Sequence, residues 1–217
     1  MSTELLKEIH FTLDKNCELD LFVPLTLPYF RPNQVTKTIA KNAKINPGDC
    51  IFEIGAGIGG LTILLVKYHP QLEIIYSVEI VPQQVEAARE NIKRHNLESK
   101  VKVLQGSLFE PIKEYSPQLK ANVIIGDCSG MTTLGQELGW YPPQTEKEGG
   151  IPLGGDDGTS RVIPFLKQSS SYLLLEERTY FPVSPNFSDK RKILNTARST
   201  YKNVELIEEK NIPLRGE

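Results

Sequence analysis

The chain has 217 residues, of which 39% are hydrophobic and 24% are charged, and its formal net charge is −2. This length and composition predict one soluble globular domain and exclude collagen-like, low-complexity and disulfide-rich classes. The small negative charge argues against a protein that grips long nucleic acid through phosphates alone, although a single basic face is compatible with it.

The three cysteines and three histidines are scattered, so no zinc-ligand spacing occurs and we expect no metal site. A sparse, odd cysteine count is typical of a reducing compartment. No apolar run approaches the ~20 residues that span a bilayer. The first residues lack a basic segment followed by an apolar one. We therefore expect a cytoplasmic protein without a membrane segment.

Strand and helix patterns alternate along most of the chain. Residues 1–32 combine prolines with aromatic residues and are expected to form an extended lead-in. The elements expected after it are helices over 33–44, 61–68, 82–95, 159–172 and 188–201, and strands over 50–54, 73–79, 101–105, 122–126, 178–183 and 204–208, the last of which can pair with 210–214. Such alternation predicts βαβ units and a mostly parallel sheet.

Ligands bind beyond the carboxyl ends of the strands in a sheet of this kind. The residues expected there are the glycine loop over 55–60, Glu79, Gly106, Ser107, Gly126 and Asp127. The segment 131–158 is rich in Gly and Pro and contains Trp140 and Tyr141. A loop of this length in a compact domain is usually either functional or disordered, and its two aromatic residues favour a functional role.

The glycine loop is ambiguous when it is considered alone. The segment 53–60 matches both GxGxxG and ExGxGxG, the second with Glu53 as its acid, and Glu79 follows Gly60 by 19 residues. Enzymes that bind nicotinamide dinucleotides keep a ribose-binding acid at a similar distance. A carboxylate at Glu53 instead suits a ligand with sulfonium and ammonium groups, and it is awkward near a pyrophosphate. The alternative for Glu53 is that it only organises the loop by accepting hydrogen bonds from backbone amides.

Four segments resemble, in order and spacing, those of class I S-adenosylmethionine-dependent methyltransferases: EIGAGIGGLT (53–62), SVEIVPQQVEAARENIKRHNL (77–97), VKVLQGSLFEPI (101–112) and NVIIGDCSG (122–130). The resemblance is greatest to the small-domain branch of protein- and RNA-directed N-methyltransferases. It implies an α/β fold with a seven-stranded, mostly parallel, twisted sheet and helices on both faces. It also implies a methyltransferase domain over 33–217, with the lead-in over 1–32 covering its active site.

The resemblance implies S-adenosylmethionine as the cofactor and assigns roles at the edge of the sheet. The glycine loop would hold the methionine moiety, Glu79 would accept hydrogen bonds from the ribose hydroxyls, and Ile80 would pack on adenine. Ser107 stands where the family usually has Asp, so we expect a weaker contact to the adenine amine there. The cofactor-binding residues implied are Glu53, Gly55, Ala56, Gly57, Gly59, Glu79, Ile80, Ser107, Leu108 and Asp127.

Asp127 is the predicted catalytic residue. It stands where amino-methylating relatives begin the motif [N/D]-P-P-[Y/F], but Cys-Ser-Gly over 128–130 replaces Pro-Pro-aromatic. Asp127 can orient an amine or a hydroxyl or act as its general base, and the alternative is a carboxylate that caps the turn after the strand. The lost motif weakens the case for a planar amide or base amine as acceptor.

Around this corner we expect substrate contacts from Tyr29, Arg31, Ser129, Trp140 and Tyr141. Trp140 can equally pack the long loop against the body of the domain. Residues 154–158, GGDDG, resemble the GGxDG of the same branch. Their aspartates are expected to cap the next helix rather than bind the acceptor.

We therefore predict a methyltransferase that acts on a nitrogen or oxygen of a small molecule or a polypeptide. The alternatives are an RNA or protein amide N-methyltransferase, an NAD(P)-dependent oxidoreductase and a binding module without activity. Nucleic acid is the less expected partner because the chain is slightly acidic and the Pro-Pro-aromatic motif is lost. The sequence does not fix the oligomeric state.

Overall fold

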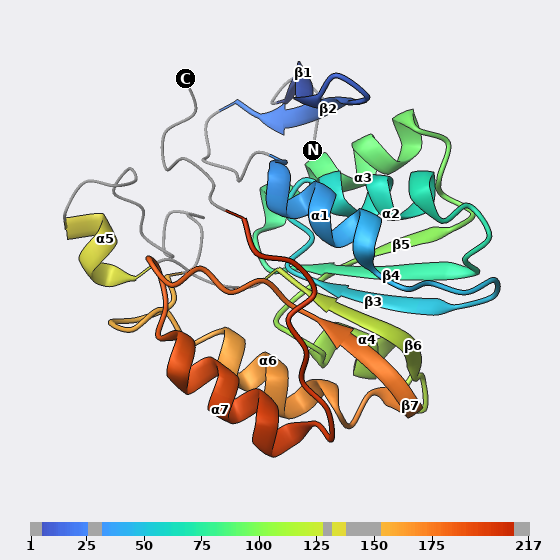
Figure 1. The fold of residues 1–217 in the computed structure, drawn as a ribbon. Coiled ribbons are helices and arrows are strands. Elements are labelled where there is room, and N and C mark those ends of the chain that lie inside the picture. Colours follow the sequence, from blue (N-terminus) through green and yellow to red (C-terminus); the bar gives the residue numbers. More distant parts are fainter. Residues whose placement is uncertain (1–5, 26–31, 128–131, 138–152, 211–217) are drawn as a thin grey trace.

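Five parallel strands form the central sheet of the structure (Figure 1), a computed structural model that describes residues 6–25, 32–127, 132–137 and 153–210. Their order across the sheet is β5-β4-β3-β6-β7. Their bounds are β3 Cys50–Ile54, β4 Ile74–Glu79, β5 Val101–Gln105, β6 Ala121–Gly126 and β7 Leu173–Tyr180. The chain order reverses between β3 and β6, so the crevice where ligands bind in such sheets lies beyond the carboxyl ends of these two strands.

Helices cover both faces of this sheet (Figure 1). One face carries α1 Gln34–Asn42, α2 Gly60–Tyr68 and α3 Pro82–Arg94, and the other carries α4 Glu110–Tyr115, α6 Val162–Ser169 and α7 Lys190–Thr200. The short helix α5 Thr133–Glu137 stands apart at the left of the view. Successive strand residues point to opposite faces, so Ile51 joins the core under α1 to α3, whereas Phe52 joins the core under α4, α6 and α7.

The predicted α/β fold with a mostly parallel sheet between helices is confirmed. The strands predicted over 50–54 and 101–105 match β3 and β5. Asn33 caps α1, because its side-chain oxygen accepts hydrogen bonds from the amides of Val35 (2.8 Å) and Thr36 (3.3 Å). The helix predicted over 82–95 matches α3 to within one residue, and Asn96 adopts a positive φ of 56° just beyond it.

Residues 6–25 differ from the expected lead-in. β1 Leu6–Asp14 and β2 Cys17–Pro24 form an antiparallel hairpin. Its inward side chains, among them Phe11 and Leu21, belong to the same core as α2 and α3. The described residues thus carry seven strands, five in the central sheet and two in this hairpin.

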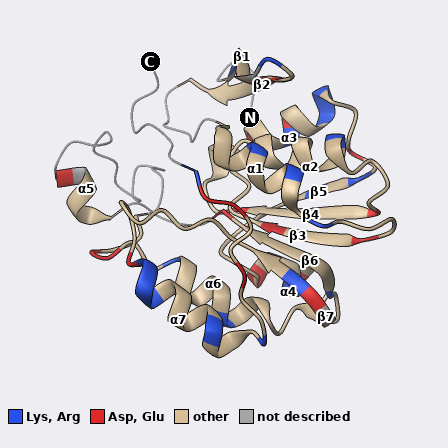
Figure 2. Ribbon diagram, viewed as in Figure 1, with Lys and Arg blue, Asp and Glu red and all other residues tan. Residues whose placement is uncertain are grey.

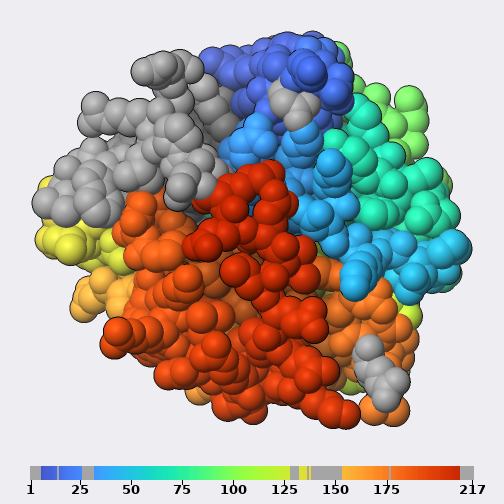
Figure 3. Space-filling view, viewed as in Figure 1, coloured from blue at the N-terminus to red at the C-terminus, as the bar shows by residue number. Residues whose placement is uncertain are grey.

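Strands near the C-terminus also depart from the prediction. β7 begins at Leu173, ahead of the strand predicted over 178–183, because pairing with β6 already starts there and includes a bulge. Residues 204–208 form no strand with any described residue, and most of the partner predicted for them, 210–214, lies outside the described residues. The Leu206 side chain is 76% exposed, and residues 204–208 are held to α1 by side chains, such as Asn42 donating to Glu208 (2.6 Å). Figure 3 shows residues 201–210 lying across the face between α1 and α7.

No helix within the described ranges is long and apolar enough to cross a bilayer. The side chains described there also form no group of three or more His, Cys, Asp or Glu placed to hold a metal ion.

Candidate active site

The carboxyl ends of β3, β4, β5 and β6 bring the predicted site residues together along one rim. Neighbouring strand ends are joined by backbone hydrogen bonds from Gly55 to Val78 (2.9 Å), from Gly106 to Glu79 (3.0 Å) and from Asp127 to Ile54 (2.9 Å). These bonds place the glycine loop, Glu79 and Asp127 side by side, as the parallel sheet predicts.

The glycine loop turns sharply between β3 and α2. Gly55, Gly57 and Gly59 all have positive φ, at 86°, 56° and 85°, a region that L side chains occupy only at a cost. The amide of Gly59 closes the turn by donating to Ala56 O (2.9 Å), and Gly59 then serves as the N-cap of α2. The loop therefore presents backbone amides with no Cβ atoms at its three turning points.

Glu79 organises this loop from the end of β4. One carboxylate oxygen accepts the amide of Gly57 (2.8 Å), and the other accepts the amides of Ile80 (2.8 Å) and Val81 (2.9 Å). Burial raises the pKa of the Glu79 carboxyl, and the three amides act against that rise. Glu79, rather than Glu53, is thus the acid that holds loop amides.

Glu53 is fully buried between β3, β4 and α2. One of its oxygens accepts hydrogen bonds from the hydroxyls of Thr62 and Ser77, the latter at 2.8 Å. Its other oxygen has no hydrogen-bond partner among the described residues. Burial raises the pKa of Glu53 to about 7 against the two hydroxyl bonds, and the charges of Asp127 and Glu79 raise it further. The alternative in which Glu53 binds loop amides is therefore not observed.

Asp127 follows β6, at the place in the sheet where the chain order of the strands reverses. Gly126, just before it, packs so closely that a Cβ there would lie 2.4 Å from the ring of Phe165. This close packing and the hydrogen bond from the Asp127 amide to β3 fix the backbone position from which the Asp127 side chain extends. The residue is partly exposed, and burial of its carboxyl raises the pKa to about 6. A carboxylate with this pKa is ionised at neutral pH yet able to take up a proton.

The end of β5 supplies a second tight turn on the same rim. Gly106 has a φ of 148°, and a Cβ there would lie 2.4 Å from Pro111. Leu108 also has positive φ, 49°, and Ser107 and Leu108 are partly buried. Ile80, at the end of β4, is 38% exposed and offers apolar surface next to Glu79.

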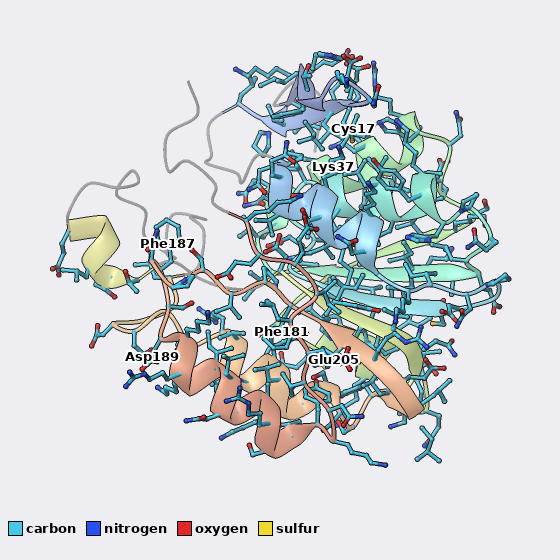
Figure 4. The ribbon with its side chains drawn as sticks, in the orientation of Figure 1. Cys17, Lys37, Phe181, Phe187, Asp189 and Glu205 are labelled. Atoms are coloured by element: carbon cyan, nitrogen blue, oxygen red, sulfur yellow. The ribbon has the colours of Figure 1, made fainter. Side chains whose placement is uncertain are left out.

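The GGDDG segment supports the fold rather than the rim chemistry. One oxygen of Asp157 accepts from the amide (3.0 Å) and hydroxyl (2.6 Å) of Thr159, and the other accepts from Lys192 (2.7 Å). The bonds from Lys192 and Thr159 lower the pKa of Asp157 to about 2. The Asp189 amide ahead of α7 donates to Asp157 O (2.8 Å), and Figure 4 shows Asp189 at the start of that helix. Asp157 thus organises the turns before α6 and α7. It does not cap α6 as expected, because the N-cap of that helix is Arg161 and no described side chain caps it.

Five predicted substrate contacts lie outside the described residues: Tyr29, Arg31, Ser129, Trp140 and Tyr141. Three buried polar residues next to the rim were not singled out from sequence: Thr62, Ser77 and Asn91. The sequence offered one signal for each of them, namely a polar residue on a face of its helix or strand that is otherwise apolar and therefore buried.

Comparison with known sequences gives the family. The sequence profile of the TRM5/TYW2 methyltransferase domain matches residues 17–133, more than half of the chain. The release factor glutamine methyltransferase of Aquifex aeolicus (strain VF5) is 32% identical over 108 residues, which cover 49% of this chain and 36% of that protein. The ribosomal protein L11 methyltransferase of Carboxydothermus hydrogenoformans (strain ATCC BAA-161 / DSM 6008 / Z-2901) is 32% identical over 80 residues, which cover 37% and 26%. The chain therefore spans about a quarter to a half of the length of the curated relatives it matches.

Solved structures show the same fold. The precorrin-6y C5,15-methyltransferase from Geobacter metallireducens GS-15 has a TM-score of 0.54 and 12% identity, covering 77% of this chain and 71% of that one. A precorrin 8W decarboxylase from the Methanobacterium thermoautotrophicum genome has a TM-score of 0.52 and 15% identity, covering 80% and 74%. At these identities the likeness concerns the fold alone.

The matched profile runs from β2 through β6, which is the part of the chain that builds the rim. The ambiguity between a dinucleotide and an adenosyl sulfonium is thereby answered in favour of the second. The chain belongs to the TRM5/TYW2 methyltransferase domain family, a family of class I methyltransferases whose cofactor is S-adenosylmethionine.

Proposed function

We propose that the rim binds S-adenosylmethionine and that Asp127 orients a nitrogen or oxygen acceptor on a polypeptide. The chain's own groups suit this cofactor. The turn at Gly55 to Gly59 offers backbone amides in left-handed conformations, and Glu53 keeps one buried oxygen without a partner among the described residues. An acidic rim favours a ligand that carries sulfonium and ammonium charges.

The remaining contacts follow from position. The Glu79 oxygen that accepts the Gly57 amide keeps one further acceptor site, and this site serves a ribose hydroxyl, whereas the other oxygen already accepts two amides. Ile80 supplies the exposed apolar surface for adenine. Ser107 and Leu108, in the turn after β5, meet the adenine edge.

S-adenosylmethionine supplies an activated methyl group when it is bound. The protein's part is to hold the acceptor atom in line and to receive its proton. Asp127 accepts a hydrogen bond from the N–H or O–H of the acceptor and takes that proton as the new bond to the methyl carbon forms and the sulfur–carbon bond breaks. Correct positioning can supply ~7–11 kcal/mol of the barrier, so the aligned walls around Asp127 matter as much as its basicity.

The position of Asp127 carries the proposal. Its amide bonds to Ile54 O (2.9 Å), the residue directly before the glycine turn, so its carboxyl lies next to the part of the rim assigned to the reactive end of the cofactor. A polypeptide acceptor is supported by the two curated relatives above, whose names give a release factor and a ribosomal protein. The proposal includes a cytoplasmic location.

A transfer assay tests this proposal. The purified protein is incubated with methyl-labelled S-adenosylmethionine and a cell extract freed of small molecules, and the label is followed after protease or ribonuclease treatment. We expect protease-sensitive label. D127N should lower the label about 100-fold or more while its affinity for S-adenosylhomocysteine stays within about threefold of the unaltered protein. D156N, on the exposed neighbour of Asp157, is the matched control and should transfer normally. Equal loss of binding and transfer in D127N would show that Asp127 is structural.

A second candidate acceptor is RNA, which one surface feature favours. α7 has the sequence KRKILNTARST without an acid, and it exposes Lys190, Arg191 and Arg198. Figure 2 shows Lys and Arg near the start and near the end of α7, and Figure 1 shows that α7 begins on the side of the carboxyl rim. Such cations can contact phosphates. Ribonuclease-sensitive label in the same assay would select this candidate over a polypeptide.

A further inference from the structure

Asn91 of α3 lies at the meeting point of three parts of the molecule. Its side chain is fully buried. Its oxygen accepts the amide of Phe22 in β2 (2.5 Å), and its NH₂ group donates to Phe22 O (2.9 Å) and to Ile58 O in the glycine loop (2.8 Å). The side-chain amide pairs with both polar backbone groups of Phe22, as a neighbouring strand would. All polar hydrogens of this amide are therefore used.

The bond to Ile58 acts on the peptide that sets the glycine turn. Ile58 O and the amide of Gly59 belong to the same planar peptide unit. The amide of Gly59 donates to Ala56 O (2.9 Å), which closes the turn, and Gly59 begins α2 in a left-handed conformation. Holding Ile58 O thus fixes the direction of the Gly59 amide. Asn91 supports the loop from α3, as Glu79 supports it from β4.

The hairpin packs against the same loop from outside. A Cβ on Gly60 would lie 2.6 Å from Pro32, just beyond the hairpin, and 3.6 Å from Leu21 in β2. Ile58 and Leu21 belong to one buried core. The hairpin is anchored to α3 a second time, where His95 Nε2 lies 3.0 Å from Asp20 O. Asn91 thus joins β2 to Ile58 by direct hydrogen bonds on both sides.

We infer that the hairpin β1–β2 is a working part of the cofactor site and that Asn91 is the positioning residue that joins it to the glycine loop. The inference rests on the proposed function, because it assigns the loop to S-adenosylmethionine. It differs from the expected cover over the active site. The hairpin acts through a buried amide on the far side of the loop, so no contact with the cofactor is needed.

The test compares binding with stability. N91D keeps the size of the side chain and its acceptor but loses both N–H donors, so Ile58 O and Phe22 O are left without them. In calorimetry we expect S-adenosylhomocysteine to bind N91D about tenfold more weakly. This is the size of effect expected when the buried Ile58 carbonyl, which lies in the glycine loop, loses its donor. I193A creates a cavity on the buried side of α7, in the core on the other face of the sheet. It is the control for lost stability alone, and its affinity for S-adenosylhomocysteine should stay within about twofold of that of the unaltered protein. Unchanged affinity in N91D would overturn the inference.

A second measurement needs no variant and so applies even if N91D does not fold. Hydrogen exchange of the unaltered protein is followed with and without S-adenosylhomocysteine. We expect slower exchange at the amides of Gly57 and Gly59 and also at Phe22, whose amide donates to the Asn91 side chain that holds the loop. Protection of the loop without protection of β2 would refute the coupling alone. A protein that binds no S-adenosylhomocysteine would refute the cofactor site and this inference with it.

Discussion

Replacing Glu53 with glutamine isolates the consequence of burying a carboxyl group beneath the glycine loop. The carboxyl is fully buried, with one oxygen bonded to two hydroxyls and the other without a partner among the described residues. Burial raises its pKa from 4.5 to about 7. The folded state therefore holds a proton that the unfolded chain releases between these pH values.

The sign and size of the effect follow by linkage. A carboxyl whose pKa is raised by folding adds stability at low pH, and this contribution is complete below about pH 4.5 and is lost as the pH rises to about 7. At about 1.4 kcal/mol per pKa unit, the shift corresponds to a loss of about 3 kcal/mol in the free energy of unfolding across this window. E53Q has no proton to release. Its NH₂ group replaces the unpartnered oxygen at a cost of ~1–3 kcal/mol that does not depend on pH.

Urea unfolding at several pH values between 4.5 and 8 measures the effect. We expect the stability of E53Q to rise relative to the unaltered protein by about 3 kcal/mol across this range. E86Q, which breaks an exposed pair with Arg89 on α3, is the surface control and should run parallel to the unaltered protein. Parallel profiles for E53Q and the unaltered protein would refute the reasoning, because they would mean that Glu53 titrates alike in the folded and unfolded states.

Three other outcomes are expected. In G158A a Cβ would lie 1.9 Å from a backbone oxygen ahead of α7, so the free energy of unfolding in urea should fall by about 3 kcal/mol or more. In G48A, where φ is similarly positive but the surrounding space is open, it should fall by only about 1 kcal/mol. Equal losses would contradict the close approach. E79Q replaces one carboxylate oxygen with an NH₂ group, so at least one of the three amides that Glu79 holds loses its acceptor. S-adenosylhomocysteine should then bind about tenfold or more weakly in calorimetry, and an unchanged affinity would show that Glu79 is not part of the site. Binding of S-adenosylmethionine at pH 7 should release protons, because its positive charge favours ionised Glu53 and Asp127; binding heats that are equal in buffers of different ionisation enthalpy would argue against this.

The sequence determined the order of the central elements and the rim. β3 and β5 have the predicted bounds, Glu79 is the last residue of its strand, and Asp127 follows its strand directly. These features depend on local patterns: short apolar runs for buried strands, glycines where φ must be positive, and acids at the end of a strand. In a parallel sheet, such local positions converge on one edge without further information.

The tertiary structure decided which acid supports the loop. The sequence placed both Glu53 and Glu79 near the glycines, but only packing shows that Glu53 turns toward the hydroxyls of Thr62 and Ser77 while Glu79 takes the loop amides. The side chain of a residue in a strand is fixed to one face of the sheet, and its partners then depend on the helix that covers that face. The partner of Glu53 on that face is Thr62 of α2, and the spacing of these residues in the sequence does not predict that pairing.

The two ends of the chain needed tertiary information most. The alternation of Cys17, Leu19, Leu21 and Val23 is a strand signal that the prolines nearby obscured, and the hairpin gains its stability from burial against α3. Residues 204–208 have the composition of a strand, yet they pair with no strand among the described residues and leave Leu206 in solvent. A strand forms only where a partner edge and a covered face are both available. The sequence can therefore state that a segment is able to pair, but the arrangement of its neighbours decides whether it does.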